Sequence, residues 1–417
     1  MIGGGIFAVT GLAIELTRGA APIAFLVAGI VALLTSYCYL KLTLAFPGEG
    51  GTVDFLNRAF GDGILVGAAN ILLLLSYVVL LAIYAYAFGS YGADFFPLPQ
   101  QTFWLHALAS GVIVGLLALN VLAATAVIRS ENTFNVLKML LLAGFVIAGF
   151  VSTGTDWSRL DPVGAVGPIG LVSGAMLIFL NYEGFELIAN SSNDVADPKR
   201  SLPIAYVGGV LIVIVFYMMI VAVVLGHMSL EEIAAHRDTA LSAAAQRILG
   251  PVGFYAIVAA ALLATSSAIN ATFHSTGRLA YVVAKTGELP RNLERSFKGD
   301  PIEGSILCAV LALAIVNFVP LEAIATMGSA GFLILFGAVN LANMRLARQT
   351  GSNVWISALA AVAAFAALFV LCFSVYQDPA SRNQLWILVG MIVLSLVIEI
   401  VYRSITGRRI RLHQEGA

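Results

Sequence analysis

The chain has 417 residues, of which 60% are hydrophobic and 11% are charged. Soluble domains are roughly 45–50% apolar and about 25% charged, so this composition excludes an ordinary soluble fold and indicates a membrane protein. The 22 Lys and Arg nearly balance the 23 Asp and Glu, which leaves a net charge of −1 and no sign of the basic surface that a nucleic-acid partner requires.

Apolar stretches follow one another along the chain, and all but the first are close to the length that crosses a bilayer. The first covers 1–17, and the others cover 20–45, 62–90, 103–127, 132–152, 168–191, 202–226, 251–274, 302–319, 322–344, 354–375 and 384–402. At roughly 20 residues for each crossing, they predict an all-α integral membrane protein of about 12 transmembrane helices. No room remains for a separate soluble domain.

Two of these stretches are interrupted. The first contains Gly3, Gly4 and Gly5, and glycine weakens a helix by about 1 kcal/mol relative to alanine. The sixth contains NYEGFE at 181–186, with ionisable groups near mid-span, where they are costly and usually face a cavity. Because the breaks lie five helices apart, they predict inverted repeats over 1–152 and 168–345 with substrate bound between two discontinuous helices. We therefore expect a transporter core at 1–345, and helices 11 and 12 with a cytoplasmic tail at 346–417.

Basic residues predict the orientation, because short cytoplasmic loops carry an excess of Lys and Arg. If the first helix starts on the cytoplasmic side, most basic residues lie in cytoplasmic loops. The exceptions outside are Arg18, Arg159, Arg237, Arg247 and Arg382. We expect a multi-pass protein of the plasma (cell inner) membrane with a cytoplasmic C-terminus.

The three cysteines, Cys38, Cys308 and Cys372, all lie in apolar stretches. Their odd number and scattered positions argue against a disulfide framework and a cysteine-based metal site. The chain also lacks metal-ligand spacing, a nucleotide-binding loop and a nucleophile–base arrangement. We therefore expect neither a metal nor a cofactor, and an intramembrane enzyme is the weaker class.

Four motifs together resemble the amino acid–polyamine–organocation (APC) family of secondary transporters. They are MIGGGIF at the start, AFPGEGGTVDFLNRAFGD after the second stretch, YEGFELIANSSNDVADPKRSLPIA in and after the sixth, and NATFHSTGRLAYVVAKTGELP ending near Pro290. In that family, the methionine of MIG lies inside helix 1, after a cytoplasmic half-helix. The resemblance therefore implies that the first half of helix 1 is missing here, because of a late start site or a fragment.

The two breaks together suit an amino acid. Free N–H groups of Gly3, Gly4 and Gly5, at the positive end of the helix that continues through Ile6, would bind a carboxylate. Carbonyl groups exposed at Leu180, Asn181 and Glu183 would bind an ammonium group, and the resemblance implies the same assignment. Tyr182 and Phe185 could cover the ligand or simply pack. The full set of expected substrate-binding residues is Ile2, Gly3, Gly4, Gly5, Ile6, Leu180, Asn181, Tyr182, Glu183 and Gly184.

Lys138 is the basic residue that this topology places inside a span, in the fifth helix. It could snorkel to the interface. The resemblance instead implies a coupling role, because some proton-coupled relatives carry a lysine there in place of a sodium ion; its neighbours would be the Gly3 region, Ser266 and Ser267. Glu186 could serve gating or proton sensing, or only tie neighbouring backbone.

Two further ionisable residues, Glu183 and His274, each have two possible roles. Glu183 could carry a proton or balance a cationic substrate. His274 could relay protons or be ordinary polar lining.

We therefore expect a secondary active transporter that moves amino acids by alternating access with proton coupling, and not an enzyme. Its partners would be an amino acid, protons and the lipid bilayer. A polyamine or organic-cation carrier or exchanger is an alternative, which would need at least two acids facing the cavity. A receptor or scaffold without transport is another. The sequence does not predict which amino acid binds, whether transport is symport or exchange, or which oligomer forms.

Overall fold

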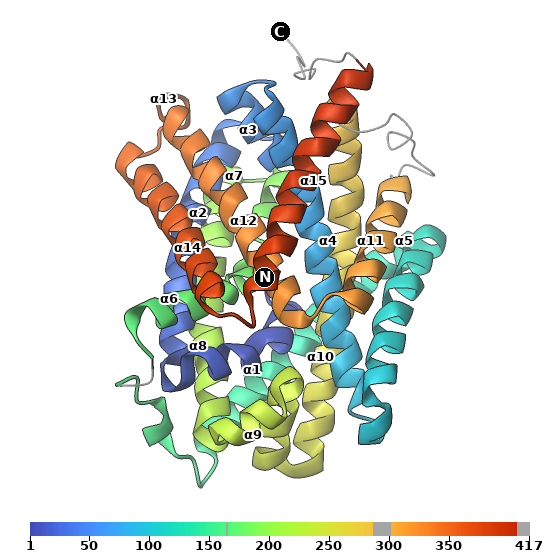
Figure 1. The fold of residues 1–417 in the computed structure, drawn as a ribbon, viewed down its shortest axis with the longest axis vertical. Coiled ribbons are helices and arrows are strands. Elements are labelled where there is room, and N and C mark those ends of the chain that lie inside the picture. The colour runs from blue at the N-terminus through green and yellow to red at the C-terminus, as the bar shows by residue number, and fades with distance from the viewer. Residues whose placement is uncertain (164–165, 287–301, 407–417) are drawn as a thin grey trace.

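The computed structural model describes residues 1–163, 166–286 and 302–406, and within them all side chains except those of 123–132, 285, 286, 302 and 406. Every regular element in these ranges is a helix (Figure 1). The elements of the first half are α1 (Gly5–Thr17), η1 (Arg18–Ala20), α2 (Ala21–Ala45), α3 (Thr52–Phe60), α4 (Ile64–Ala93), α5 (Leu98–Val151), η2 (Trp157–Leu160), α6 (Pro168–Leu177), η3 (Phe179–Tyr182) and η4 (Glu186–Asp194).

The second half continues in the same way. Its elements are α7 (Pro198–Pro203), η5 (Ile204–Gly208), α8 (Gly209–His227), α9 (Leu230–Ala235), η6 (Arg237–Thr239), α10 (Ala240–Thr286), α11 (Ile302–Phe318), α12 (Leu321–Arg345), α13 (Ala347–Thr350), α14 (Val354–Gln377) and α15 (Arg382–Thr406). The basic residues of the stretch 287–301 and of the tail after 406 lie outside the described residues, as does the side chain of Arg129.

Length and apolar composition confirm the all-α membrane architecture. Nine helices in the described ranges could cross a membrane, and a pair bent by 50°, Pro168–Leu177 with Phe179–Asp194, raises this to ten. Both predicted segments at 1–17 and 20–45 fall in the single candidate Gly5–Ala45, and Glu303–Phe318 is a shorter apolar helix. All the predicted stretches are therefore helical, while the number of about 12 crossings stays a prediction.

Two boundaries differ from the expectation. The spans at 103–127 and 132–152 lie on one continuous helix, α5. The span at 251–274 is part of α10, which starts eleven residues earlier at Ala240 and bends at Gly250, whose φ is +64°, before Pro251. Hydropathy marks the lipid-exposed part of a helix, so it cannot show how far the helix continues into polar surroundings.

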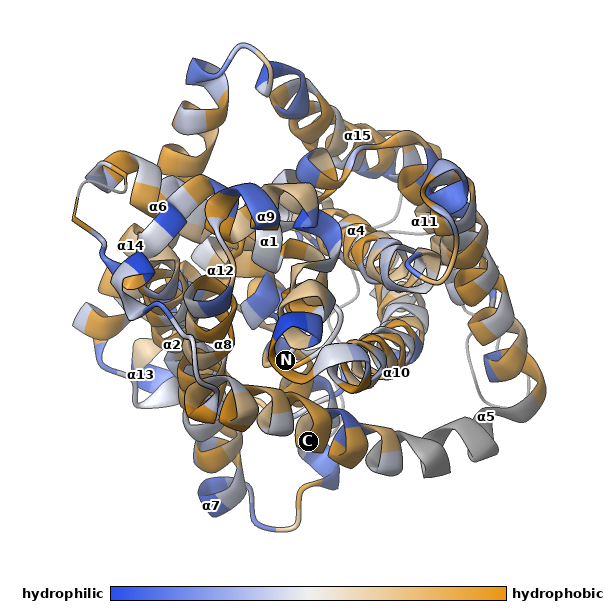
Figure 2. Ribbon diagram, turned by 90° about the horizontal axis from the view of Figure 1, so that it is seen from below, coloured by the Kyte–Doolittle hydropathy of each residue, from blue (hydrophilic) through white to orange (hydrophobic). Residues whose placement is uncertain are grey.

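The helices are arranged around α1, α4, α10 and α12. The helix α4 packs against α5, α10, α12 and α15, and α1 contacts α4, α6 and α10. Figure 2 shows hydrophobic residues along the long helices and hydrophilic ones on short helices such as α7 and α9. The last turns of α15 lie at the end of the molecule that carries α3 and α13, and α9 lies at the opposite end (Figure 1).

Candidate functional site

Residues 1–4, which we call the first break, are not helical. Gly3 and Gly4 precede the helix, α1 begins at Gly5, and no side chain among the described residues caps this end. Ile6 is completely buried, and Ile2 is partly buried. The expectation of three free glycine N–H groups is wrong for Gly3, because its N–H donates to the Met1 carbonyl at 2.9 Å. A tight turn satisfies that donor, so an anion would have to use the amides that follow it.

The second break separates α6 from η4. Glu183 is extended, with φ −69° and ψ 161°, and Gly184 has φ +107°, a conformation that a residue with a side chain rarely adopts. The predicted discontinuity of the sixth segment is therefore present. A non-glycine residue at 184 would also meet Met1, whose nitrogen lies 2.9 Å from an ideal Cβ built on Gly184.

The two breaks face each other. A Cβ added to Gly5 would collide with the side-chain oxygen of Asn181. The Tyr217 hydroxyl on α8 lies 3.0 Å from the Met1 carbonyl and 3.2 Å from the Asn181 carbonyl, so one donor contacts both breaks. Sequence reasoning missed Tyr217; its only signal was a phenol inside the apolar run VIVFYMMIV.

Two side chains at this junction are buried without partners. Asn181 and Glu183 are each 2% exposed, and neither the amide atoms of Asn181 nor the carboxylate oxygens of Glu183 find a hydrogen-bond partner among the described residues. A buried carboxylate or amide without partners costs several kcal/mol in general, so such groups call for a ligand. Both a donor and acceptors are thus available at the break.

The backbone carbonyls expected to bind an ammonium group are partly used. The Leu180 carbonyl accepts from the Glu183 N–H at 3.3 Å, and that of Asn181 accepts from Tyr217. Each keeps one lone pair, because a carbonyl oxygen can accept two hydrogen bonds. Tyr182 donates to the Phe25 carbonyl at 2.6 Å, which ties its side chain to α2.

Phe185 is completely buried, and its ring packs against Tyr39 and Phe336. Like Tyr182, it therefore packs against its neighbours in this structure.

Glu186 differs from Glu183 in having a partner for each oxygen. One oxygen accepts from the Gly184 N–H at 2.7 Å and the other from the Tyr77 hydroxyl on α4 at 3.1 Å. These bonds match the backbone tie that the sequence left open as an alternative. A role in gating or proton sensing stays a prediction.

Lys138 lies inside the protein. Its side chain is 7% exposed, so it does not snorkel to the surface. One turn earlier on α5, Asn135 accepts from the Ser267 hydroxyl of α10 at 3.4 Å. The neighbouring Ala268 Cβ is 3.1 Å from an ideal Cβ on Gly3, so this part of α10 contacts both α5 and the first break.

Two other polar residues of α10, for which the sequence suggests a role, are more exposed than Ser267. Ser266 is partly buried, and His274 is exposed.

This chain is similar to known proteins over almost its whole length. The sequence model of the amino acid permease family matches residues 1–397. The inner membrane transport protein YbaT of Escherichia coli is 32% identical over 97% of this chain and 93% of its own length. An uncharacterized protein of Methanocaldococcus jannaschii is 30% identical over 98% of this chain and 93% of its own length. The branched-chain amino acid permease BcaP of Lactococcus lactis is 26% identical over 88% of this chain and 85% of its own length.

Proposed function

This chain belongs to the amino acid permease family, and we propose that it moves its amino acid across the membrane by alternating access, with the substrate held between the breaks of α1 and α6. Membership makes it an amino acid transporter of the APC superfamily and not an enzyme. The transporter core would be residues 1–345, in the plasma membrane, with the C-terminus in the cytoplasm.

The observation that carries the proposed site concerns Asn181, which lies against Gly5, and Glu183: among the described residues, the polar side-chain atoms of both are buried without a hydrogen-bond partner. An α-amino acid has an ammonium group that can donate to the Glu183 carboxylate and the free lone pairs nearby. Its carboxylate can accept from the Asn181 amide and from the uncapped amides at the start of α1, where the helix dipole is positive. One zwitterion thus satisfies both sets of groups.

Proton coupling through Lys138 is the second part of the proposal. A buried ammonium group inside a membrane is costly, and it usually marks an ion or proton pathway. The position of Lys138 on the part of α5 next to Ser267 is compatible with the coupling role that the family resemblance implies. The carrier would then be independent of sodium.

A polyamine or organic-cation carrier is less well supported. A substrate with two positive charges needs two available acids, but Glu186 is already bonded to Gly184 and Tyr77. Among the described acids of the break, this leaves Glu183 for the substrate.

Uptake into proteoliposomes tests the function. Purified protein is reconstituted, and accumulation of each radiolabelled L-amino acid is measured with an inward proton gradient, with and without sodium; protein-free liposomes and labelled putrescine serve as controls. We expect accumulation of at least one amino acid that needs the proton gradient and not sodium. Sodium-dependent uptake would reject the coupling. Binding without accumulation of any amino acid would favour a receptor.

A further inference from the structure

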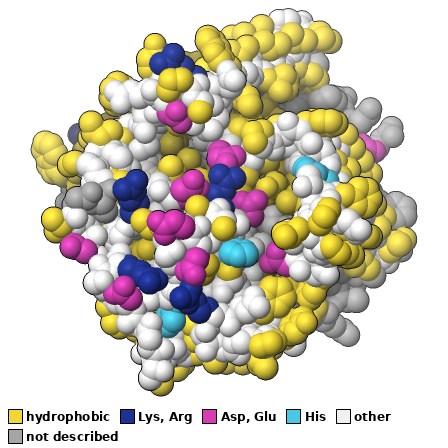
Figure 3. All heavy atoms as spheres, turned by 60° about the horizontal axis from the view of Figure 1, so that its bottom comes forward, with side chains coloured by type: hydrophobic (Ala, Val, Ile, Leu, Met, Phe, Trp, Pro, Cys, Tyr) yellow, Lys and Arg dark blue, Asp and Glu magenta, His cyan; other side chains and the backbone are white. Residues whose placement is uncertain are grey.

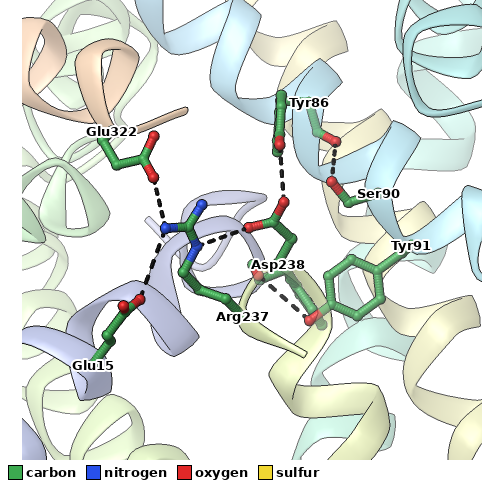
Figure 4. A network of polar contacts seen from close by, with 8 residues as sticks. Glu15, Tyr86, Ser90, Tyr91, Arg237, Asp238 and Glu322 are labelled. Carbon is green, nitrogen blue, oxygen red and sulfur yellow. Dashed lines mark hydrogen bonds and ion pairs between the residues drawn. The ribbon is translucent and has the colours of Figure 1, made fainter. Parts of the chain in front are cut away.

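A group of charged residues lies at the end of the molecule that carries α9, on the face turned forward in Figure 3. Arg237 of η6 is at its centre (Figure 4). One of its terminal nitrogens is 2.6 Å from a Glu322 oxygen and 3.8 Å from a Glu15 oxygen, and its Nε is 3.4 Å from Asp238. We call Glu15, Arg237, Asp238 and Glu322 the Arg237 cluster. It places one positive charge among three carboxylates.

The Arg237 cluster joins elements that are far apart in the sequence. Glu15 is in the last turn of α1, and Glu322 is in the first turn of α12. The second oxygen of Asp238 accepts from the Tyr86 hydroxyl of α4 at 2.9 Å. The three-residue helix η6 is therefore fastened to α1, α4 and α12 at once.

The backbone of η6 lies directly on α1. An ideal Cβ on Gly11 would collide with the carbonyl oxygen of Arg237, and it would be 2.8 Å from its carbonyl carbon. The absence of a side chain at Gly11 is what allows this close packing. At 1.5 Å per residue, Gly11 lies about 9 Å along α1 from the break at Gly5, so η6 covers the helix that leads from this face to the proposed substrate site.

We propose that the Arg237 cluster holds η6 across α1, α4 and α12 and thereby closes the substrate site on the face predicted to be outside the cell. This rests on the proposed transport function, because closure of one face matters to a carrier. Removing the Arg237 charge leaves the three carboxylates to repel one another, and they stand on the elements that must separate. Loss of the guanidinium should therefore shift the protein toward a state that is open on this face.

Arg247 provides a matched control on the same face. It pairs with Glu232 of α9, and both side chains are about half exposed, at 51% and 44%. The pair joins α9 only to the start of α10. An ion pair this exposed contributes little to the stability of the fold. Arg247→Ala thus removes the same charge without releasing η6 from α1 or α12.

Thiol labelling tests the proposal without requiring transport. Ser90 of α4 is 4% exposed and lies one turn from Tyr86. Ser90→Cys is introduced after the three native cysteines are replaced by alanine, and its reaction with a polar maleimide is followed in purified protein in nanodiscs. We expect Arg237→Ala to raise the labelling rate about tenfold or more, within the range typical of coupled two-state equilibria, and Arg247→Ala to leave it unchanged.

Equal labelling of the parent and Arg237→Ala would overturn the proposal, as would an equal rise with Arg247→Ala. If Arg237→Ala does not fold, Glu322→Gln removes the 2.6 Å pair and should also raise labelling; an unchanged rate would count against the cluster in the same way. Uptake is measured separately on the same preparations. If amino acids are taken up but Arg237→Ala does not change the labelling rate, the closure by the Arg237 cluster is rejected and the transport function stands. If Arg237→Ala raises the labelling rate but no amino acid is accumulated, the proposed transport function is rejected.

Discussion

Replacing Glu183 should raise the stability of the substrate-free protein and weaken the binding of the amino acid. Both of its carboxylate oxygens are buried without a partner in the described part of the chain. Glu183→Met keeps a side chain of similar length and removes the polar oxygens. Because a buried group without partners destabilises the protein, the variant should unfold less readily in the absence of substrate, by about 1–3 kcal/mol. Because the carboxylate is proposed to bind the ammonium group, the same variant should bind the amino acid poorly.

The loss of affinity can be bounded. Removing one partner of a buried, hydrogen-bonded charge pair costs about 2–5 kcal/mol, or roughly a 30- to 4,000-fold increase in Kd. Thermal unfolding of purified protein, with and without an amino acid that the uptake panel shows to be transported, reports both effects. Glu183→Met should raise Tm without the amino acid and lose the increase that the amino acid causes in the parent.

Glu186→Met is the matched control from the same break. It leaves the Gly184 N–H and the Tyr77 hydroxyl without their acceptors, so it should destabilise the protein by about 2–6 kcal/mol, at 1–3 kcal/mol for each group. The reasoning is refuted if Glu183→Met lowers Tm in the absence of substrate, or if the amino acid stabilises it as much as it does the parent.

Three further substitutions test other parts of the molecule. Gly5→Leu would drive the Asn181 side chain out of its place and should abolish amino acid binding while the protein still inserts; unchanged affinity in a binding assay would show that the first break is not the site. Lys138→Ala should abolish uptake driven by a proton gradient while leaving equilibrium binding measurable, and a variant that still accumulates substrate would exclude the lysine from coupling. Gly11→Ala should push η6 away from α1 by overpacking worth about 1–3 kcal/mol, and faster labelling at Ser90→Cys would report it; an unchanged rate would contradict the close packing.

The helices and both breaks were predictable because their signals are local. Three adjacent glycines and a polar cluster inside apolar stretches mark positions 3–5 and 181–186 without any knowledge of the fold. The partners across space were not predictable. Nothing in the run around Tyr217 indicates that its hydroxyl contacts both breaks, and nothing near Arg237 indicates that Glu15 and Glu322 lie beside it. Long-range contacts of single polar residues leave no periodic pattern in one sequence.

The same limit explains the differences between Glu183 and Glu186. Both are acids in NYEGFE, and nothing in the sequence predicts that Glu186 has two hydrogen-bond partners while Glu183 has none in the described part of the chain. The difference follows from Gly184, whose positive φ turns the chain so that its own N–H meets Glu186. Met1 also packs against this glycine, and a tertiary contact of this kind leaves no local pattern in the sequence.

The helix η4 has an unusual length for its type. Glu186–Asp194 forms nine residues of 3₁₀-helix, whereas runs beyond three or four residues are uncommon. A 3₁₀-helix rises about 2.0 Å per residue against 1.5 Å in an α-helix, so rewinding these residues would shorten the segment by about 4.5 Å. The bonds from Glu186 to Gly184 and Tyr77 fix one end of η4 at the break. Such a change would draw the far end of η4 at Asp194 toward the break, while Glu186 could keep both of its hydrogen bonds.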